Sequence, residues 1–173
     1  MRTREIQNTL DTLLCRSRAR SWFVLPRNYL KLVHIKRFPC AIIMNTDDWP
    51  GVGGVHWIGL WYDVSKRLTF FDSLGLPPSA YGLILRPYEW NKKVLQGNSD
   101  LCGEYSLLFI DLMSKGGSLR QVLKLFSNNK MKNDRLVHHY FKRIRPSQSH
   151  IHCTDVDQSC AYNCQNGRRQ NHV

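Results

Sequence analysis

Four side chains suited to acid–base and nucleophilic chemistry follow one another within 47 residues of this chain. They are His56, Asp72, Gln96 and Cys102, and each lies at the edge of an apolar run. Apolar runs form the rigid strands and helices of a core, so a side chain at the end of one is held in a fixed direction. This ordered set constrains the fold strongly, because the four act together only if the chain brings them to one place.

Cys102 stands at the start of a predicted helix, which is a favourable place for a nucleophile. A cysteine attacks as the thiolate, and a helix N-terminus or a nearby imidazolium stabilises that form. The first turn of a helix also leaves backbone N–H groups unpaired, and these can bind the oxyanion of a tetrahedral intermediate. The side-chain amide of Gln96 can supply a second donor. The two residues together indicate a nucleophile beside its oxyanion hole.

His56 is the expected general base, and Asp72 is the acid expected to orient it. They lie at or near the ends of neighbouring predicted strands, so a contact between the two side chains is possible. Three of the four residues also have an ordinary interpretation: Cys102 as a core cysteine, His56 as a buried histidine with its hydrogen bonds satisfied, and Asp72 as an aspartate in a turn. The joint pattern of cysteine at a helix start, amide upstream and histidine before acid favours a cysteine hydrolase.

The apolar patterns along the chain predict a mixed α+β domain. Helical spacing predicts helices over residues 4–15, 101–113 and 118–126, and from Asn133 or Asp134 to Arg143. β-branched and aromatic runs predict strands over 40–45, 55–64 and 67–72, a further strand within 89–96 and an extended segment at 22–25. Residues 97–100 contain helix-capping side chains, and Gly116-Gly117 ends the preceding helix. The segment 73–88 stays open between a short helix and irregular structure.

The length of 173 residues, with 42% hydrophobic, suits one domain with a core. We expect that domain to cover residues 1–145 and a flexible basic tail to cover 146–173. The tail contains three histidines and three cysteines without paired C-x2-C spacing, so we expect no metal site. The chain has no membrane-length apolar run and no secretory signal. We therefore expect a protein inside the cell, with its cysteines mostly reduced.

The net charge of +12 is divided unevenly along the chain. Residues 1–44 carry +7, residues 45–90 carry −2 and residues 91–173 carry +7, so the basic segments flank the four-residue pattern. Lys and Arg clusters bind polyanions because they release counterions from phosphates. We expect non-specific DNA contact through two clusters, with solubility alone as the alternative. The clusters are Arg16, Arg18 and Arg20, and Lys142, Arg143 and Arg145.

Several segments carry motifs that are specific to one family of proteases. They are Cys40-Ala41-Ile42-Ile43-Met44-Asn45-Thr46, Gly53-Gly54-Val55-His56-Trp57, Phe70-Phe71-Asp72-Ser73-Leu74-Gly75, and the segment from Gln96 to Gly103. Over roughly residues 20–143 the chain resembles the adenovirus endopeptidase (adenain) family and its relatives in Polinton/Maverick elements and adintoviruses. The spacing from Gln96 to Cys102, and an aspartate as the third member, are similar to the ubiquitin-like-protein proteases, which share the fold.

The resemblance implies a papain-like, α+β cysteine protease domain, in which a central mixed sheet packs against helices and the nucleophile begins a buried helix. It implies a monomeric endopeptidase that cleaves viral capsid or core precursors beside Gly-Gly or Gly-X, in the virion and the host nucleus. His56 matches the catalytic histidine of the family and Asp72 its acid. Gln96 matches its oxyanion glutamine and Cys102 its nucleophile.

The resemblance also implies partners. No cofactor is required for the chemistry, but DNA and a short disulfide-linked viral peptide stimulate the adenovirus enzyme. The charge of +12 fits the first, whereas no cysteine lies between Asp72 and Gln96, where the family's linking cysteine is expected. Around the catalytic positions we expect Gly54, Trp57 and Gly103 to contact substrate, with Trp57 as a wall beside the site.

Two other functions stay open from the sequence. The spacing from Gln96 to Cys102 also fits an isopeptidase that removes ubiquitin or ubiquitin-like modifiers, which is a deubiquitinase or deSUMOylase activity. The basic clusters also fit a nucleic-acid-binding protein whose catalytic site is vestigial.

Overall fold

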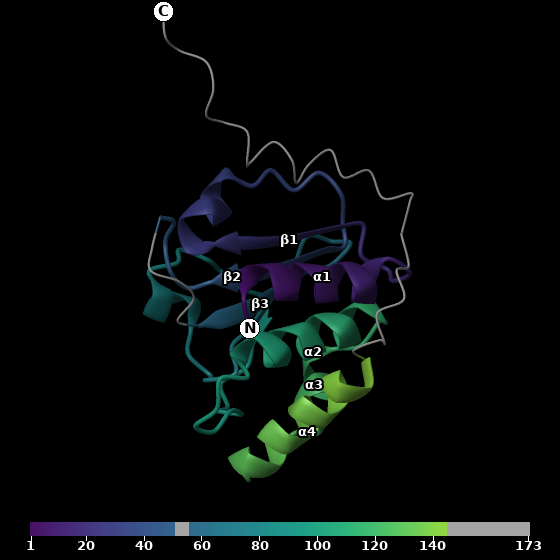
Figure 1. Cartoon of the computed structure of the whole chain (residues 1–173). Coiled ribbons are helices and arrows are strands. Elements are labelled where there is room, and N and C mark those ends of the chain that lie inside the picture. Colours follow the sequence, from purple (N-terminus) through teal and green to yellow (C-terminus); the bar gives the residue numbers. More distant parts are fainter. Residues whose placement is uncertain (51–55, 145–173) are drawn as a thin grey trace, which may run out of the picture.

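A mixed sheet of five strands forms the centre of the molecule (Figure 1). The computed structural model describes residues 1–50 and 56–144. The strands are β1 (Ser21–Pro26), β2 (Cys40–Asn45), β3 (Trp57–Tyr62), β4 (Leu68–Phe71) and β5 (Glu89–Trp90), and they lie in that order across the sheet. β2, β3 and β4 pair antiparallel as neighbours, while β1 and β5 run parallel to β2 and β4. The predicted three neighbouring strands are confirmed.

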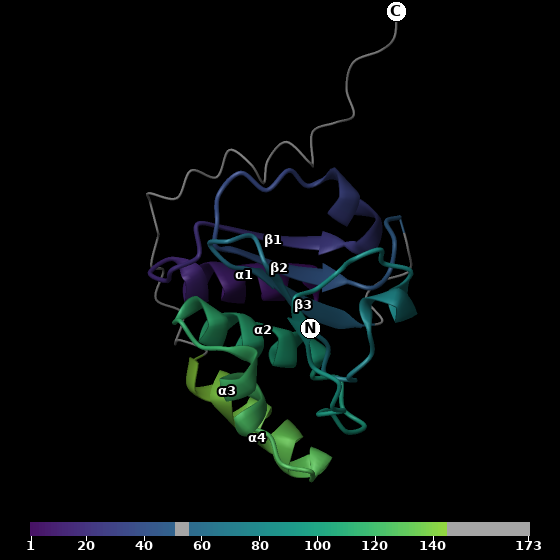
Figure 2. The same cartoon turned by 180° about the vertical axis from the view of Figure 1, so that it is seen from behind.

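The helices gather on one side of this sheet, as the two opposite views show (Figures 1 and 2). They are α1 (Thr3–Leu14), α2 (Cys102–Ser114), α3 (Leu119–Lys124) and α4 (Lys130–Ile144). α2 contacts β2 and β3 directly, and α3 and α4 pack against α2. Two short 3₁₀ helices, η1 (Arg27–Leu32) and η2 (Pro78–Tyr81), complete the described elements. The fold is therefore α+β, with a mixed five-stranded sheet packed against helices.

β2 is buried along its whole length because both faces of the sheet are covered. Ala41 and Ile43 belong to the core cluster that the helices form with one face of the sheet. Cys40, Ile42 and Met44 belong to a second cluster on the other face, where side chains from η1 and from residues 81–85 pack. A strand that is covered on both sides has no polar alternation, so the prediction from its unbroken apolar run is confirmed.

α2 is buried on nearly every side, which differs from the apolar stripe that its sequence suggests. Twelve of its thirteen residues are buried. The exception is Leu112, which is partly buried and packs against the core cluster of the helix side. α2 lies between α1, the sheet and α4, so its neighbours also cover the face that an ordinary surface helix turns to water. The apolar residues of the helix pack in the core as their spacing predicts, and the neighbouring elements bury its other faces as well.

Gly59 in the middle of β3 lets α2 approach the sheet closely. A Cβ atom at this position would lie 2.7 Å from Cδ1 of Phe109 on α2, which is too close for any side chain. The ring of Phe109 stacks on that of Phe71, with centroids 4.8 Å apart and planes 5° from parallel. Phe71 directly precedes Asp72, so this contact joins α2 to the end of β4.

The predicted capping of α2 and the predicted start of α4 were wrong. Leu101 is the N-cap of α2 and makes no side-chain cap, so the polar residues of 97–100 do not cap it. α4 begins three to four residues before the predicted start, where the Asn129 side chain accepts a hydrogen bond from the Lys132 amide over 3.1 Å. Asn133 and Asp134 instead bind the segment before α2, through Leu95 O (2.9 Å) and Gly97 N (3.2 Å). Tertiary contacts therefore use the side chains that resemble caps.

The remaining expectations for secondary structure had mixed outcomes. α1 and α3 form where predicted, and Ser118 with Gln121 makes a capping box at the start of α3. β5 is only two residues long, so most of the segment predicted as a strand over 89–96 is irregular. No helix among the described residues, 1–50 and 56–144, is long and apolar enough to cross a membrane.

Candidate active site

His56 and Asp72 meet at one edge of the sheet because β3 and β4 run antiparallel. His56 directly precedes β3, Asp72 directly follows β4, and Gly59 pairs with Phe71 across the two strands. The start of one strand therefore lies beside the end of the other. His56 Nε2 lies 2.6 Å from Asp72 Oδ1, and both residues are buried. The predicted contact between histidine and acid is confirmed.

Four donors hold the carboxylate of Asp72, which has no exposed surface. Oδ1 accepts hydrogen bonds from His56 Nε2 and, over 2.9 Å, from the amide of Leu74. Oδ2 accepts from the amide of Leu76 over 2.9 Å and from the hydroxyl of Tyr81 over 2.8 Å. Burial alone would raise the pKa of Asp72, but these hydrogen bonds and the His56 charge keep it below its usual range. The carboxylate therefore stays ionised beside His56.

Asn91 fixes the backbone of Asp72 from the other side. Its Oδ1 accepts from the Asp72 amide over 2.9 Å, and its Nδ2 donates to the Asp72 carbonyl over 2.6 Å. Asn91 is itself fully buried and follows β5. A side chain that pairs with both backbone groups of one residue replaces a strand neighbour at this point, so β4 is held in place one residue beyond its last ladder bond.

The pKa of His56 is set by opposing effects. Burial disfavours the charged ring and would lower it, but the hydrogen bonds and charges of Asp72 and Cys102 raise the pKa to about 9. His56 is therefore an imidazolium at neutral pH. Because Nε2 faces Asp72, the other ring nitrogen, Nδ1, is the one left for the sulfur of Cys102. A histidine placed between a carboxylate and a thiol can move a proton to and from the sulfur.

Cys102 is the first residue of α2, as the sequence predicted. It is buried, with 8% of its surface exposed, and it contacts the core cluster of the helix side. The amides of the first helical turn have no partners within the helix, and the helix dipole adds positive potential there. Cys40 shows the contrast, because burial is the main cause that raises the pKa of its thiol to about 11. Cys102 has the environment of a nucleophile and Cys40 that of a core residue.

Gln96 is held at both ends of its side-chain amide. Its Oε1 accepts a hydrogen bond from the hydroxyl of Ser73 over 2.6 Å, and its Nε2 donates to the carbonyl of Ser99. A carbonyl only accepts, so the amide nitrogen must face Ser99 and the orientation is fixed. An amide NH₂ has two hydrogens, and the second remains for an oxyanion. The hydroxyl of Tyr105 on α2 also bonds Leu95 O over 3.3 Å, which keeps this segment beside the first turns of α2.

The three predicted substrate-binding residues have different placements. Trp57 is 3% exposed and packs in the core cluster of the helix side, so it supports the site from behind and offers little surface to a ligand. Gly103 is buried, and a Cβ there would lie within 3.4 Å of Ile6 and Met1. Its missing side chain thus makes room for the N-terminal segment. Gly54 lies outside the described residues. A role in substrate binding stays a prediction for all three.

Two site residues were not recognised in the sequence. Tyr81, at the end of η2, bonds Asp72 and stacks on the ring of His56, with centroids 5.9 Å apart. Asn91 clamps the backbone of Asp72. Both come from the stretch after Asp72, where short elements and Pro-Pro leave little periodicity to read. The one available signal was the presence of polar and aromatic residues near an otherwise complete histidine–acid pair.

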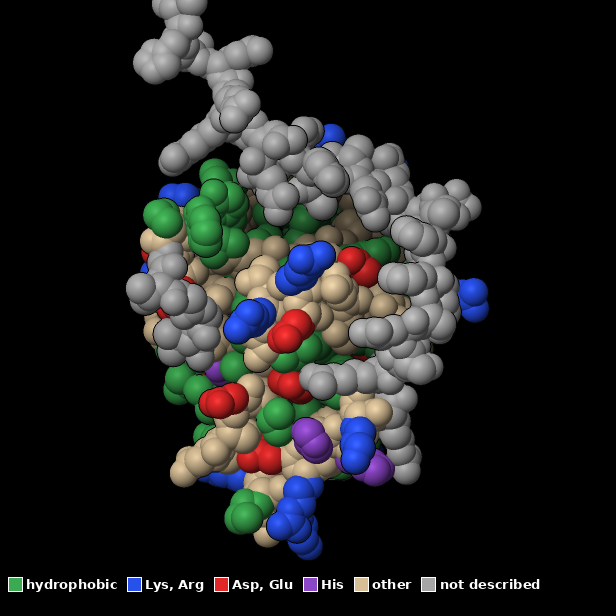
Figure 3. Space-filling model, in the orientation of Figure 1, with side chains coloured by type: hydrophobic (Ala, Val, Ile, Leu, Met, Phe, Trp, Pro, Cys, Tyr) green, Lys and Arg blue, Asp and Glu red, His purple; other side chains and the backbone are tan. Residues whose placement is uncertain are grey.

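The basic residues lie at the opposite end of α2 from Cys102. Arg18 donates its amide to Ser114 O at the end of α2. Arg16, Arg18, Arg20 and Lys142 are exposed. α4 runs alongside α2 in the same direction, because Asp134 bonds Tyr105 while Tyr140 bonds Asp111. In Figure 3, Lys, Arg and His side chains gather over α4. The side chain of Arg143 and the whole of Arg145 lie outside the described part of the chain.

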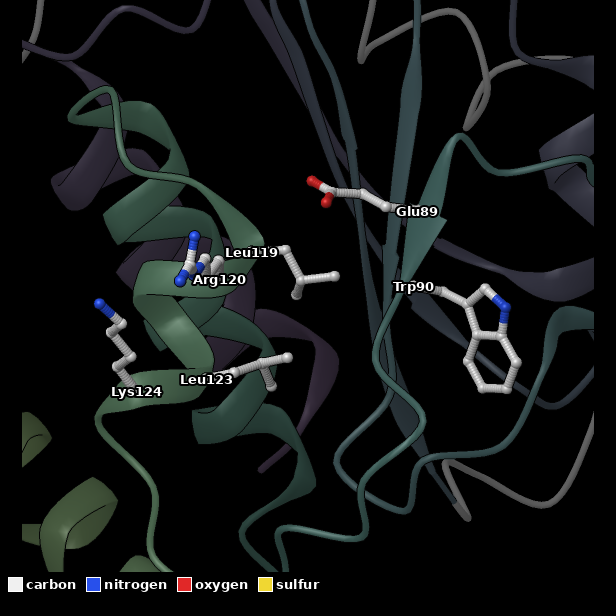
Figure 4. A pocket seen from close by; sticks show the side chains of 6 residues that line it. All are labelled: Glu89, Trp90, Leu119, Arg120, Leu123 and Lys124. Carbon is white, nitrogen blue, oxygen red and sulfur yellow. The ribbon is translucent and has the colours of Figure 1, made fainter.

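No cluster of His, Cys, Asp and Glu that could hold a metal ion occurs within residues 1–50 and 56–144. The predicted tail, 146–173, lies outside the described residues. A groove of about 400 Å³ between β5 and α3 is not lined by His56, Asp72, Gln96 or Cys102. In Figure 4, Leu119 and Leu123 point across it towards Glu89, whereas Trp90 points away.

No protein-family model matches the chain, and a search of curated proteins finds no match.

Proposed function

We propose that the protein is a cysteine endopeptidase with Cys102 as nucleophile, His56 as base and acid, Asp72 as the orienting carboxylate and Gln96 as an oxyanion donor. One observation carries the proposal. His56 bonds a fully buried Asp72 through Nε2 over 2.6 Å, and its pKa responds to Cys102 at the start of α2. A structural histidine needs neither an ionised carboxylate nor a thiol at a helix start, whereas thiol hydrolysis needs both.

The first half of the reaction forms a thioester. Cys102 Sγ attacks the carbonyl carbon of the scissile peptide bond, and the carbonyl electrons move to the oxygen. The amides of the first turn of α2 and the remaining hydrogen of Gln96 Nε2 stabilise this oxyanion. His56 gives its proton to the leaving nitrogen as the C–N bond breaks. A histidine with a pKa of about 9 carries that proton at neutral pH.

The second half restores the enzyme. His56, now neutral, takes a proton from water, which attacks the thioester carbonyl. The C–S bond then breaks, the sulfur leaves as the thiolate, and the peptide product is released as a carboxylic acid. Asp72 keeps one tautomer of His56 through both halves, because its Oδ1 accepts the hydrogen on Nε2. Nδ1 is therefore the atom that exchanges protons with sulfur, leaving group and water.

The proposed substrates are capsid or core precursor proteins of a virus or a transposon, cleaved beside Gly-Gly or Gly-X in the virion and the host nucleus. The resemblance to the adenain family motivates this choice. The α+β fold and the order His56, Asp72, Gln96, Cys102 support the same papain-like family. Gly residues in a substrate also suit a nucleophile that is only 8% exposed, because a backbone without side chains can approach it closely.

Incubation with peptides that contain Gly-Gly tests the proposal. We expect cleavage by the wild type and none by Cys102→Ala, while Cys40→Ala retains cleavage because Cys40 is buried in the opposite core cluster. Cleavage that persists in Cys102→Ala would contradict the assignment. Mass-spectrometric mapping of iodoacetamide labelling provides a readout that needs no substrate, and Cys102 should react faster than Cys15 and Cys40. The same peptide joined through a lysine side chain distinguishes an isopeptidase from an endopeptidase.

A second function, non-specific DNA binding, is favoured by the exposed arginines at the end of α2 that lies away from Cys102. The thirteen residues of α2 separate the two by about 20 Å at 1.5 Å per residue. Peptide and DNA would then bind without competing. We expect affinity for duplex DNA to fall steeply with salt. Replacement of Arg16, Arg18 and Arg20 by Ala should weaken binding and reduce that slope, and a salt-independent affinity would contradict this function.

A further inference from the structure

Tyr81 contacts both members of the histidine–acid pair, although it comes from neither strand that carries them. Its hydroxyl donates to Asp72 Oδ2 over 2.8 Å. Its ring stacks on the His56 ring, with centroids 5.9 Å apart and planes 27° from parallel. Tyr81 is the last residue of η2 and thus belongs to a separate segment that covers the pair. One side chain therefore restricts the rotation of the carboxylate and of the imidazole together.

The hydroxyl of Tyr81 is a permanent donor in this position. Burial and the negative charge of Asp72 raise the pKa of Tyr81 far above its usual value, so it does not ionise in the working range of the protein. The other partners of Asp72 are His56 and the amides of Leu74 and Leu76. Tyr81 is thus the one side chain, besides His56 itself, that the described residues direct at this carboxylate.

Arg27 holds the segment that carries Tyr81. Its Nη1 donates to the Tyr81 carbonyl over 3.1 Å. Its Nε and Nη2 make a two-point contact with Asp48, at 2.9 and 2.7 Å. Asp48 belongs to the segment between β2 and β3, which leads to His56. A guanidinium has a planar, fixed set of donors, so this contact links the two segments that approach His56 from opposite directions in sequence.

We propose that Tyr81 is a positioning residue that aligns Asp72 and His56 for proton transfer, and that Arg27 fixes its backbone. The inference rests on the proposed peptidase function. Tyr81 shares the charge of Asp72 with His56 and keeps the plane of the ring in line with Cys102. The titratable groups that face His56 are Asp72 after β4, Cys102 on α2 and Tyr81 on η2.

The test is Tyr81→Phe, which removes one hydroxyl and keeps the stacked ring. We expect kcat for the Gly-Gly peptide to fall about 10- to 100-fold with KM unchanged, as for the loss of one hydrogen bond to a charged group. With one donor fewer, Asp72 gives more of its charge to His56, so the upper pKa in the pH profile of Cys102 alkylation should rise by about half a unit from about 9. Tyr62→Phe is the control, because Tyr62 is a partly buried tyrosine at the far end of β3.

Two different outcomes distinguish a failure of the proposed peptidase function from a failure of the role proposed for Tyr81. If wild-type Cys102 is no more reactive than Cys15 and no peptide is cleaved, the proposed function fails. If the wild type is active but Tyr81→Phe matches Tyr62→Phe in kcat, or its upper pKa is unmoved or lowered, Tyr81 does not position the pair. Arg27→Met should reproduce part of the fall in kcat, and wild-type kcat in that variant would remove Arg27 from the proposal.

Discussion

Two aspartates, Asp72 and Asp111, are completely buried, and they lie near opposite ends of α2. Both oxygens of Asp72 have two donors each, and two of these four donors are backbone amides. Asp111 instead concentrates its partners on Oδ2, which accepts from Lys115 over 2.7 Å and from the hydroxyl of Tyr140. Among the described residues, Asp111 Oδ1 has no hydrogen-bond partner.

The difference shows two uses for a buried carboxylate. The donors of Asp72 are part of a turn and a ring stack, so its charge points in one fixed direction, towards His56. The partners of Asp111 are a lysine that is 61% exposed and a tyrosine from another helix, so this carboxylate joins α4 to α2. In the proposed function Asp72 orients His56, whereas Asp111 joins two helices. We therefore expect a substitution of Asp72 to reduce mainly the activity, and a substitution of Asp111 to reduce mainly the stability of the fold.

The largest expected effect is the loss of activity in Asp72→Asn. The amide keeps the shape but can donate to Nε2, which reverses the tautomer of His56, and we expect kcat to fall about 10³-fold. Without the Asp72 charge, the pKa of His56 should drop from about 9 towards 6.5, so the alkaline limb of the pH profile moves to lower pH. Steady-state kinetics from pH 5 to 10 measure both. Asp111→Asn is the matched control, and equal losses in the two variants would break the comparison.

A pH-dependent change in stability should follow next in size. The folded pKa of His56, about 9, exceeds the reference of 6.5, so its pairing stabilises the fold fully below pH 6.5. That stabilisation is lost as the pH rises through about 9, by roughly 2–3 kcal/mol. Urea unfolding across this range measures the slope. It should persist in Asp111→Asn and flatten in Asp72→Asn, and a slope retained in Asp72→Asn would contradict the assignment to this pair.

Asp111→Asn should reduce stability by a smaller amount while leaving the chemistry unchanged. Removal of the charge weakens the bonds to Lys115 and Tyr140, and we expect the free energy of unfolding to fall by about 1–2 kcal/mol, because Lys115 can return to water. Denaturant titration measures this fall, and kcat of the folded protein should equal that of the wild type. A changed kcat would show that contacts at the C-terminal end of α2 influence the proposed active site.

The smallest effect is expected for Lys115→Met. A partner that is largely exposed contributes little to an ion pair, so the loss should stay below about 1 kcal/mol. Thermal unfolding of Lys115→Met beside Tyr140→Phe sharpens the comparison, since Tyr140 is the less exposed of the two partners and should matter more. The reverse order would show that the lysine, rather than the contact between helices, stabilises Asp111.

The parts of the site that could be predicted are those that local pattern determines. A cysteine at a helix start and a histidine and an aspartate at ends of antiparallel neighbours follow from apolar runs alone, and all three were placed correctly. Tyr81 could not be predicted, because the fold of the segment 73–88 depends on what it covers and its sequence has no period. The role of Arg27 could not be predicted either, because its partners, Asp48 and the Tyr81 carbonyl, are distant in sequence.

The start of helix α4 is a second feature that could not be predicted from the sequence. Asn133 and Asp134 have the chemistry of caps, and sequence alone cannot tell a cap from a side chain that binds another segment. Here both face Leu95 and Gly97, next to the amide of Gln96. The burial of α2 beyond its apolar residues was also missed, because a helical pattern does not show which neighbours cover the polar side of the helix. Both features depend on contacts between elements that are far apart in the sequence, and a local sequence pattern does not contain these contacts.

Gly59 shows how the proposed site depends on packing in the apolar core. It sets how closely the helix that begins with Cys102 lies against the strand that follows His56, with the Phe109 ring 2.7 Å from where a methyl group would be. We therefore expect the distance between Cys102 and His56 to depend on a contact between α2 and β3 that contains no polar side-chain atom. We expect an alanine at this position to push Phe109, and α2 with it, away from β3, which would separate Cys102 from His56 although both side chains remain. If the proposed function holds, substitutions in the apolar core should therefore change activity as well as substitutions at the polar site.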